Sequence, residues 1–265
     1  MKIVVPIKQV PETSNVKMDP VTGTMVREGV EPIVNPLDLY AIEAAVTLKE
    51  KWGGAVVAIS MGPPKAALAL KEAIAMGCND GLLLSDKAFA GADTWATSYV
   101  LAQAIRKLGV FDLIICGERA TDGDTGQVGP GIAAWLDLPF ATYISAIREV
   151  RDTDLIVERM VENGYETLAV EQPCLLTVVK EINFPRLPSL KGKLTAKKMD
   201  LPVWGPQQID ANPAFLGLKG SPTRVVRIST PQVARHGELI RPKDEHELDM
   251  ALDKLVNYLV QKEII

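Results

Sequence analysis

Short apolar runs alternate with helix-like stretches over the first two thirds of the chain, and this alternation limits the fold more than any other feature. Four runs are rich in Val, Ile and Leu and end at Gly, Pro or Ser, which is typical of buried strands. They span residues 2–7, 55–60, 81–85 and 112–117. Strands that alternate with helices favour parallel pairing through right-handed crossovers. We therefore expect an α/β fold with a doubly wound, mostly parallel sheet.

The stretches between these strands carry helix signals. Asn35-Pro36 suits an N-cap followed by the first helical position, and Leu39, Ile42 and Val46 then share one face until Gly53-Gly54 ends the pattern. The remaining predicted helices cover residues 64–76, the stretch after Asp93, and about residues 126–136.

The pattern changes near Pro139. Two β-type runs, residues 155–160 and 167–170, flank Asn163-Gly164, and an Asn-Gly pair between two such runs predicts a hairpin. Residues 174–179 are typical of one more buried strand.

The last quarter of the chain is rich in Pro, Lys and Gly and lacks core-type strands. Only residues 245–263 regain a helical pattern, with leucines at spacings of four, three and four: Leu248, Leu252, Leu255 and Leu259. A segment of this kind gains stability by lying on another surface. We therefore divide the chain into an α/β core, residues 1–190, and a C-terminal extended arm, residues 191–265, that ends in a helix and packs on a partner subunit.

Charge and hydropathy exclude two classes of partner. The 29 basic and 33 acidic residues give a net charge of −4, which leaves no basic surplus for binding a phosphate backbone, so we expect no nucleic acid. No segment approaches the roughly 18 apolar residues that a membrane-spanning helix needs. The apolar run at the start is too short for a signal peptide. We expect a cytoplasmic protein without membrane insertion.

The chain offers few side chains for metal binding or nucleophilic catalysis. Its three cysteines, Cys78, Cys116 and Cys174, are scattered and are expected to be buried free thiols. Its two histidines, His236 and His246, have no Cys or His partner at ligand spacing. No candidate nucleophile has a base beside it, so we expect neither a metal site nor a catalytic residue.

The loops past the carboxyl ends of the strands form the candidate site, because ligands of doubly wound sheets bind there. The loop at residues 117–130 is the most informative. Gly123, Gly126 and Gly129 let the backbone approach a ligand closely, and the helix that follows offers N–H groups and the positive end of its dipole to a phosphate. The same pattern suits a tight turn before a capped helix, and the pattern alone leaves both interpretations open.

Acidic residues in these loops have a simpler interpretation as turn formers and caps. Asp122 and Asp124 stand two apart without a third carboxylate, which favours a turn over a cation site. Ser85-Asp86 and Asp93-Thr94 likewise precede helical patterns and suit helix caps.

Five motifs in order along essentially the whole chain resemble the β subunit of electron transfer flavoproteins. They are residues 5–11 (VPIKQVP), Asn35-Pro36, Met61-Gly62-Pro63, Cys116-Gly117 with residues 122–130 (DGDTGQVGP), and residues 185–190 (PRLPSL) followed by Ala196-Lys197-Lys198. The resemblance implies an adenine-nucleotide-binding type of core. It also implies a heterodimer in which an α subunit carries one FAD and this subunit holds an adenine nucleotide.

The resemblance also implies site residues. The cofactor-binding set would be Pro6, Asn35, Pro36, Leu37, Asp38, Met61 and the loop from Gly117 to Val128, including Ala120, Thr121, Asp122, Gly123, Asp124, Thr125, Gly126 and Gln127. In the family a leucine on a surface loop anchors the acyl-CoA dehydrogenase partner, and Leu190 stands at that place. Without the family, Leu190 is equally an ordinary apolar contact in a Pro-rich segment.

Residues 19–30 and 85–97 resemble the electron-bifurcating members of the family. In these members a second FAD takes the place of the structural AMP of conventional members and accepts a hydride from NADH. Candidates for the extra contacts to flavin or NAD are Gly91, Asp93, Thr94 and Thr97.

The resemblance is to β subunits that work with ferredoxin and with an acyl-CoA dehydrogenase or enoyl-CoA reductase-type flavoenzyme, such as caffeyl-CoA reductase, or with lactate dehydrogenase. Two alternatives stay open: a conventional AMP-holding subunit, and a free-standing adenosine-nucleotide sensor. A sensor would leave the C-terminal leucine stripe exposed, which argues against it.

Overall fold

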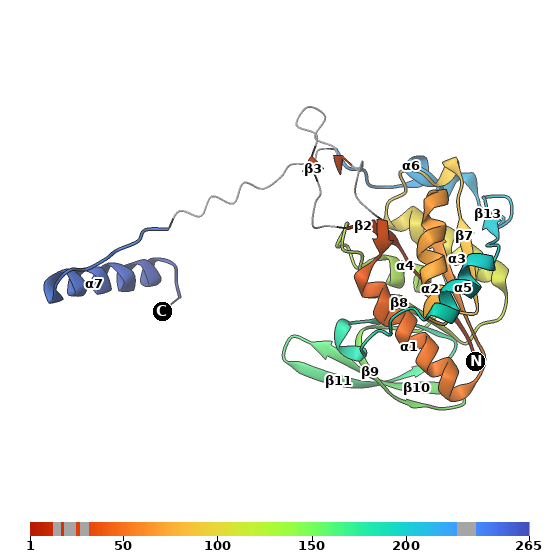
Figure 1. Cartoon of the computed structure of the whole chain (residues 1–265), viewed down its shortest axis with the longest axis horizontal. Coiled ribbons are helices and arrows are strands. Elements are labelled where there is room, and N and C mark those ends of the chain that lie inside the picture. Colours follow the sequence, from red (N-terminus) through yellow and green to blue (C-terminus); the bar gives the residue numbers. More distant parts are fainter. Residues whose placement is uncertain (13–16, 19–24, 27–31, 227–236, 265) are drawn as a thin grey trace. The chain divides into compact units, whose positions relative to one another are not determined.

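The structure is a computed structural model, and it describes residues 1–12, 17–18, 25–26, 32–226 and 237–264 (Figure 1). The chain divides into two compact units, Met1–Ile228 and Ser229–Ile265. No helix among the described residues is long and apolar enough to cross a membrane.

A nine-stranded sheet forms the centre of the first unit, in the order β11-β10-β9-β12-β8-β1-β6-β7-β13. Its strands are β1 (Lys2–Pro6), β6 (Ala55–Met61), β7 (Asp80–Leu84), β8 (Leu113–Gly117), β9 (Phe140–Val150), β10 (Asp154–Val161), β11 (Gly164–Glu171), β12 (Cys174–Val178) and β13 (Val203–Trp204). The seven strands β9-β12-β8-β1-β6-β7-β13 each pair parallel with their neighbours in this series. The other two strands form the antiparallel part, in which β10 pairs with β9 on one side and with β11 on the other. The mostly parallel α/β sheet predicted from the sequence is confirmed.

Strand order reverses at β1. From β1 the chain proceeds through β6 to β7 on one side, whereas β8 and then β12 lie on the other side. Such a reversal opens a crevice at the carboxyl ends of the two diverging strands. The ends of β1 and β8, at Pro6 and Gly117, therefore mark the place where a ligand site is expected.

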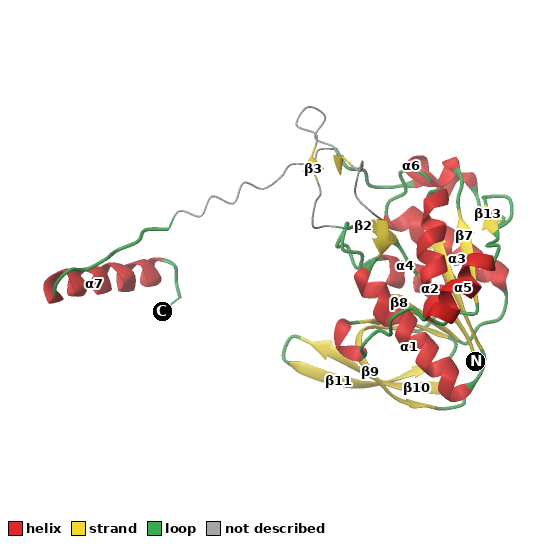
Figure 2. Ribbon diagram, in the orientation of Figure 1, coloured by secondary structure: helices red, strands yellow, loops and turns green. Residues whose placement is uncertain are grey.

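Helices cover both faces of the sheet (Figure 2). On one face α1 (Pro36–Trp52) and α2 (Ala67–Met76) pack on inward residues such as Ile3 and Val5. On the other face α3 (Thr94–Leu108) and α4 (Val128–Leu136) pack around Val4 and Ile114. Because alternate residues of β1 are buried on opposite faces, the strand is apolar throughout, which is the pattern that predicted it.

The hairpin predicted around Asn163-Gly164 is present. Strands β10 and β11 pair in full register from Asp154 opposite Glu171 to Val161 opposite Gly164, so Glu162 and Asn163 form the turn. Gly164 is the first residue of β11, with φ 148°. The sequence pattern did not predict β9, whose pairing with β12 is interrupted by a bulge. Tyr143 at that bulge has a left-handed φ of 58°, so the apolar alternation along β9 is broken.

Short elements complete the first unit. Strands β2 (Gln9–Pro11) and β5 (Pro32–Val34) form an antiparallel pair, as do β3 (Lys17–Met18) and β4 (Met25–Val26). Single 3-10 turns are η2 (Pro64–Ala66), η3 (Lys87–Phe89), η4 (Lys180–Ile182) and η5 (Pro213–Phe215).

Residues beyond 190 continue on the core before the second unit begins. Helix α5 (Leu190–Lys198) packs on α2 and buries Ala196 there, and β13 adds the edge strand beside β7. The short α6 (Gly217–Gly220) follows η5. The first part of the predicted arm is therefore held by the core of this chain, and the packing of residues 191–265 on a partner subunit stays a prediction.

The second unit contains the predicted C-terminal helix, α7 (Glu245–Gln261). Asp244 caps it, because its side chain accepts a hydrogen bond from the backbone N–H of Glu247 at 2.8 Å. Three leucines of the predicted stripe, Leu248, Leu252 and Leu255, are exposed.

Candidate functional site

A cavity of about 340 Å³ lies at the carboxyl ends of β1, β6 and β8. The first turns of α1, α3 and α4 and the loop after β8 complete its walls. Most predicted cofactor-binding residues meet here: Pro6, Asp38, Met61, Asp93, Thr94, Thr97, Gly117, Ala120, Gly123, Thr125, Gly126, Gln127 and Val128. The structure thus brings loops that are far apart in the sequence to one concave site, at the reversal of strand order.

Asn35 holds the loop that follows β8 through two side-chain hydrogen bonds. The side chain is fully buried and, although it precedes α1, it makes no cap hydrogen bond. Its Nδ2 donates to the carbonyl of Arg119 at 2.9 Å, and its Oδ1 accepts from the backbone N–H of Thr121 at 3.1 Å. Asn35 therefore fixes the path of residues 119–121, and the structure does not bring it to the cavity wall.

Asp38 places a buried carboxyl group in the cavity wall between the ends of β1 and β8. Its Oδ2 accepts from the backbone N–H of Lys8 at 2.7 Å. A Cβ atom at position 117 would lie 2.4 Å from Oδ1, so only glycine lets β8 end this close to the carboxyl group. Burial raises the pKa of Asp38 to about 7, against the opposing effect of hydrogen bonds from Lys8 and Asn35.

Gly123 faces open space in the cavity. No protein atom lies within 4 Å of where its Cβ would be, and its φ is not in the left-handed region, so neither the packing nor the backbone of this chain requires glycine there. The space that a side chain would fill is the space that a bound molecule can use. This cradle fits a nucleotide whose phosphates approach the backbone.

The first turn of α4 closes the same loop. Gln127 stands at its N-cap and its side chain caps no N–H group, while Val128 and Gly129 line the cavity. The free N–H groups and the positive end of the helix dipole at this position suit an anion. The side chain of Gln127 instead accepts a hydrogen bond from Thr94 at the start of α3, at 2.9 Å.

Asp93 is engaged by the chain itself. One carboxylate oxygen accepts from the N–H of Ala96 at 3.1 Å, which caps α3, and the other accepts from the N–H and the hydroxyl of Thr223 at 2.9 and 2.7 Å. Burial tends to raise the pKa of Asp93, but these hydrogen bonds outweigh it and hold the pKa below its ordinary value. Its contact with a ligand stays a prediction.

Ion pairs tie down the outer side of the loop. Lys8 pairs with Asp122 at 2.6 Å, and Arg119 pairs with Asp124 at 2.8 Å. Asp124 has a left-handed φ of 53°, which Asp tolerates in turns. These two acids therefore act as turn and loop contacts, in line with the simpler interpretation of the sequence, and neither lines the cavity.

The remaining predicted residues also lie off the cavity wall. Pro36 is the first residue of α1, and Leu37 passes its backbone beside Gly117. Thr121 is held by Asn35, and Gly91 lies beside Leu218 with φ 74°. Residues 19–30, which carried part of the family resemblance, fall outside the described residues except for 25–26.

The predicted cofactor-binding set omitted several wall residues, among them Lys8 and Leu101. Lys8 follows the carboxyl end of β1 and brings a cation to the cavity wall. Its position just after a predicted strand was the sequence signal that could have identified it. Leu101 reaches the cavity from the second turn of α3, where the sequence predicted only a core stripe.

The cysteines are free and buried as predicted. Burial raises the pKa of the Cys116 thiol, which lines the cavity, so it stays protonated at neutral pH. Among the described residues no group of three or more His, Cys, Asp or Glu is placed to hold a metal ion.

Comparisons with known proteins identify the family of this chain. The family described as "Electron transfer flavoprotein domain" matches residues 22–208. An electron transfer flavoprotein subunit beta of Thermoanaerobacterium thermosaccharolyticum is 48% identical over 256 residues, which are 96% of this chain and 98% of the relative.

Two further relatives match over the full length of both chains. The caffeyl-CoA reductase-Etf complex subunit CarD of Acetobacterium woodii is 46% identical, and the acryloyl-CoA reductase electron transfer subunit gamma of Anaerotignum propionicum is 41% identical. The matches cover the loops that build the cavity as well as the core beneath them. The chain belongs to the electron transfer flavoprotein family, among its beta subunits.

Proposed function

We propose that this chain is the beta subunit of a heterodimeric electron transfer flavoprotein that binds FAD in the cavity at the ends of β1, β6 and β8. The flavin held there would supply the redox chemistry: acceptance of two electrons as a hydride from NADH, and transfer of one to ferredoxin and of the other, through the FAD of the alpha subunit, to an acyl-CoA dehydrogenase or enoyl-CoA reductase-type flavoenzyme. The relatives named as parts of caffeyl-CoA reductase and acryloyl-CoA reductase systems support this class of partner.

The single observation that carries the nucleotide assignment is the open cradle at Gly123 beside the uncapped start of α4. In this proposal the backbone of residues 123–128 holds the phosphates, while the Asn35 contacts keep the loop in place. Asp38 and Met61 form the wall on the β1 and β6 side. No side chain needs to act as a general acid or base, because the cofactor supplies the redox chemistry.

The alternative is a conventional subunit that holds a structural AMP. One observation favours it: Asp86 and Asp93 both serve as caps, through hydrogen bonds from Ala88 at 2.7 Å and Ala96 at 3.1 Å. These caps account for part of residues 85–97 without any flavin contact. Thr94 and Thr97, which line the cavity at the start of α3, are the residues that a larger ligand would use.

Nucleotide content separates the two proposals. The chain is copurified with its alpha subunit, the heterodimer is denatured, and the released nucleotides are quantified. Two FAD per heterodimer would support the bifurcating proposal. One FAD with one AMP would make this subunit the structural half of a conventional carrier and would leave residues 85–97 as helix caps.

Leu190 is proposed as an anchor for the flavoenzyme partner. It is 77% exposed and begins α5, so an apolar side chain stands in solvent on a regular element. Residues 183–199 contain five basic and no acidic residues, and Lys191, Lys193, Lys197 and Lys198 make no ion pair among the described residues. The partner surface that fits is an apolar pocket with an acidic rim.

A further inference from the structure

The segment of residues 183–194, called the strap below, crosses α1 and α2 and carries Leu190. Phe184 and Leu187 of the strap are 97% and 88% exposed, more than Leu190 itself. No side chain of residues 183–195 is buried. The strap is therefore not held by burial in the core, which is the usual source of stability for a segment of this length.

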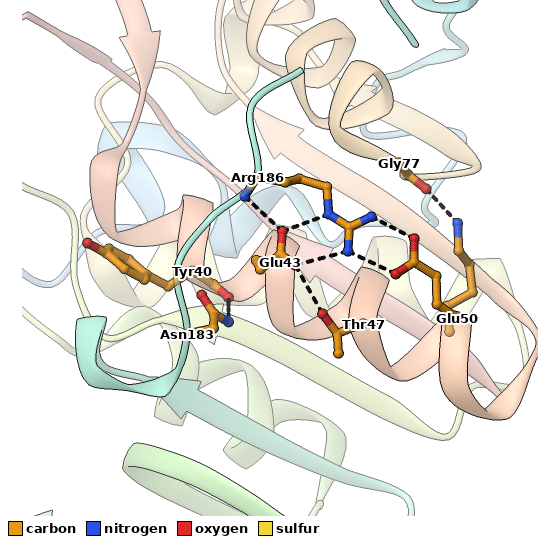
Figure 3. Close-up of polar contacts among 8 residues, drawn as sticks. Tyr40, Glu43, Thr47, Glu50, Gly77, Asn183 and Arg186 are labelled. Carbon is orange, nitrogen blue, oxygen red and sulfur yellow. Dashed lines mark hydrogen bonds and ion pairs between the residues drawn. The ribbon is translucent and has the colours of Figure 1, made fainter. Parts of the chain in front are cut away.

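Arg186 attaches the strap to α1. Its guanidinium group lies between Glu43 and Glu50, two acids seven residues apart on α1 (Figure 3). Glu43 accepts from Nε at 2.8 Å and from a terminal nitrogen at 2.9 Å, and Glu50 accepts from the terminal nitrogens at 2.6 and 2.9 Å. The backbone N–H of Arg186 also donates to Glu43, at 2.9 Å. Two paired forks of this kind fix direction as well as distance.

Two further contacts fix the strap on either side of Arg186. Asn183 donates from Nδ2 to the carbonyl of Tyr40 on α1 at 3.0 Å (Figure 3). The N–H of Ser189 donates to the carbonyl of Ala75 on α2 at 3.3 Å. A Cβ at position 192 would lie 2.2 Å from that same carbonyl, so the strap lies directly against the end of α2.

Charge pairing keeps the Arg186 contacts in place at neutral pH. The Glu43 side chain is only 10% exposed, and burial tends to raise its pKa. Hydrogen bonds from Arg186 outweigh burial and lower the pKa, with help from the hydroxyl of Thr47 at 3.0 Å. The pKa of Glu50 is lowered first of all by its hydrogen bonds to Arg186. Both acids therefore remain ionised and bound to the guanidinium group.

We propose that Arg186 is a positioning residue, which holds the strap in the conformation that presents Phe184, Leu187 and Leu190 to the flavoenzyme partner. This rests on the proposed role of Leu190. A preformed strap binds without the entropy cost of ordering it, so the loss of Arg186 weakens partner binding while the flavin chemistry in the cavity is left unchanged. Within the described residues, Arg186 is the only side chain of the strap that forms an ion pair with the core.

The test compares Arg186→Gln, Arg186→Lys, Leu190→Ala and Arg148→Gln in the purified heterodimer. Arg148 forms an arginine–glutamate pair with Glu158 at 2.8 Å on the β9–β10 pair, so its variant controls for the loss of one such pair. Hydrogen exchange of residues 187–194 reports the order of the strap without any partner. Electron transfer to purified caffeyl-CoA reductase of Acetobacterium woodii, as the probe, gives KM for the flavoenzyme and kcat.

We expect Arg186→Gln to speed exchange in the strap about tenfold. We also expect it to raise KM for the flavoenzyme about five- to tenfold at unchanged kcat and unchanged NADH-dependent flavin reduction. Arg186→Lys restores the charge without the planar fork and should recover only part of both effects. Arg148→Gln should change neither. If Arg186→Gln cannot be purified, Glu50→Gln, which leaves Glu43 in place, gives a milder loosening of the strap.

The outcomes separate this proposal from the docking proposal. If Leu190→Ala raises KM whereas Arg186→Gln changes neither exchange nor KM, the positioning role is wrong and the docking role stands. If exchange in the strap rises but only Leu190→Ala raises KM, Arg186 has a purely structural role. If Leu190→Ala leaves KM unchanged, the docking role itself is wrong.

Discussion

Helix α1 supports two regions of opposite character. Its N-terminal end, with Asn35 and Asp38, supports the cavity, which is concave and has open space at Gly123. Its middle and C-terminal end, with Glu43 and Glu50, support the strap, which exposes apolar side chains. A small molecule fits the first region and a protein surface fits the second. In our proposals, one helix therefore supports both the nucleotide site and the docking site and holds them in fixed register.

The two regions also differ in how their supporting acids respond to pH. The pKa of Asp38 is raised to about 7 by burial, so the free energy of unfolding that depends on it falls as pH rises from about 4 to 7. The pKa values of Glu43 and Glu50 are lowered, so the contribution of the strap contacts is present above the ordinary pKa of 4.5 and is lost in acid. The supports of the cavity and the strap therefore weaken in opposite directions.

The largest expected effect is at Gly123. Gly123→Val fills the open cradle with a branched side chain, and we expect the heterodimer to lose its beta-subunit nucleotide. Because no protein atom lies within 4 Å of the new Cβ, the free energy of unfolding of the nucleotide-free protein should change little. Nucleotides released on denaturation give the first quantity and urea unfolding gives the second.

Gly237→Val is the matched control for this substitution. Gly237 also has no atom within 4 Å of its Cβ position, no left-handed φ, and no place in the cavity wall. Unchanged nucleotide content in Gly123→Val would show that the cradle does not hold the ligand, and the assignment of this cavity would be wrong.

The next effect is at Asn35. Asn35→Ala removes both hydrogen bonds that this fully buried side chain makes to the loop, and leaves the carbonyl of Arg119 and the N–H of Thr121 without this partner. We expect the free energy of unfolding to fall by about 2–3 kcal/mol and nucleotide affinity to fall with it. Urea unfolding at fixed heterodimer concentration measures the first quantity. A loss of less than about 0.5 kcal/mol would show that the loop keeps its path without Asn35.

The sequence predicted where α1 begins, but it did not predict that Asn35 at this point holds the loop after β8. Asn35-Pro36 correctly marks the start of α1, yet the side chain of Asn35 contacts residues 119–121, which follow it by more than 80 positions. Local propensity describes caps and periodicity, whereas such contacts depend on which strands become neighbours. Parallel order places the loop after β8 beside the start of α1, and only then does the polar side chain find these partners.

The same limit applies to the strap and to β9. The strap shows no apolar periodicity, because polar contacts to α1 hold it, and the pairing of Arg186 with Glu43 spans 143 positions. Strand β9 was missed because a bulge at Tyr143 breaks its alternation. By contrast, the buried parallel strands were confirmed, since continuous apolar runs are a property of local sequence. Their loops line one cavity because the carboxyl ends of parallel strands lie at the same edge of the sheet.

A pH-dependent effect is expected for Asp38→Asn. The substitution keeps an acceptor for the N–H of Lys8 but removes the ionisable group. The folded wild-type protein holds a proton that the unfolded chain has released between about pH 4 and 7, so its stability falls across that range. We expect the variant to lose this fall and to be about 4 kcal/mol more stable than wild type at pH 8, relative to their difference at pH 4.

Urea unfolding at several pH values measures the difference. Lys8, Glu118 and Arg119 are the other charged residues that line the cavity near Asp38. The variant leaves these three residues unchanged, so the comparison isolates the carboxyl group of Asp38. If the stability of the wild type does not change between pH 4 and 8, and Asp38→Asn behaves in the same way, Asp38 is ionised throughout this range and the prediction is wrong.

The smallest effect on stability is expected for Glu50→Gln, which loosens the strap. Glu50 is half-exposed, so Glu50→Gln should lower the free energy of unfolding by only about 0.5 kcal/mol, and less at high salt. Glu166→Gln removes a similarly exposed pair with Arg159, at 3.0 Å on the hairpin, and serves as its control. If both variants lose the same small amount of unfolding free energy and only Glu50→Gln speeds hydrogen exchange in the strap, the Arg186 contacts fix the conformation of the strap and add little to stability. A loss as large as that of Asn35→Ala would instead make the strap part of the stability core, and the contrast between the two ends of α1 would not hold.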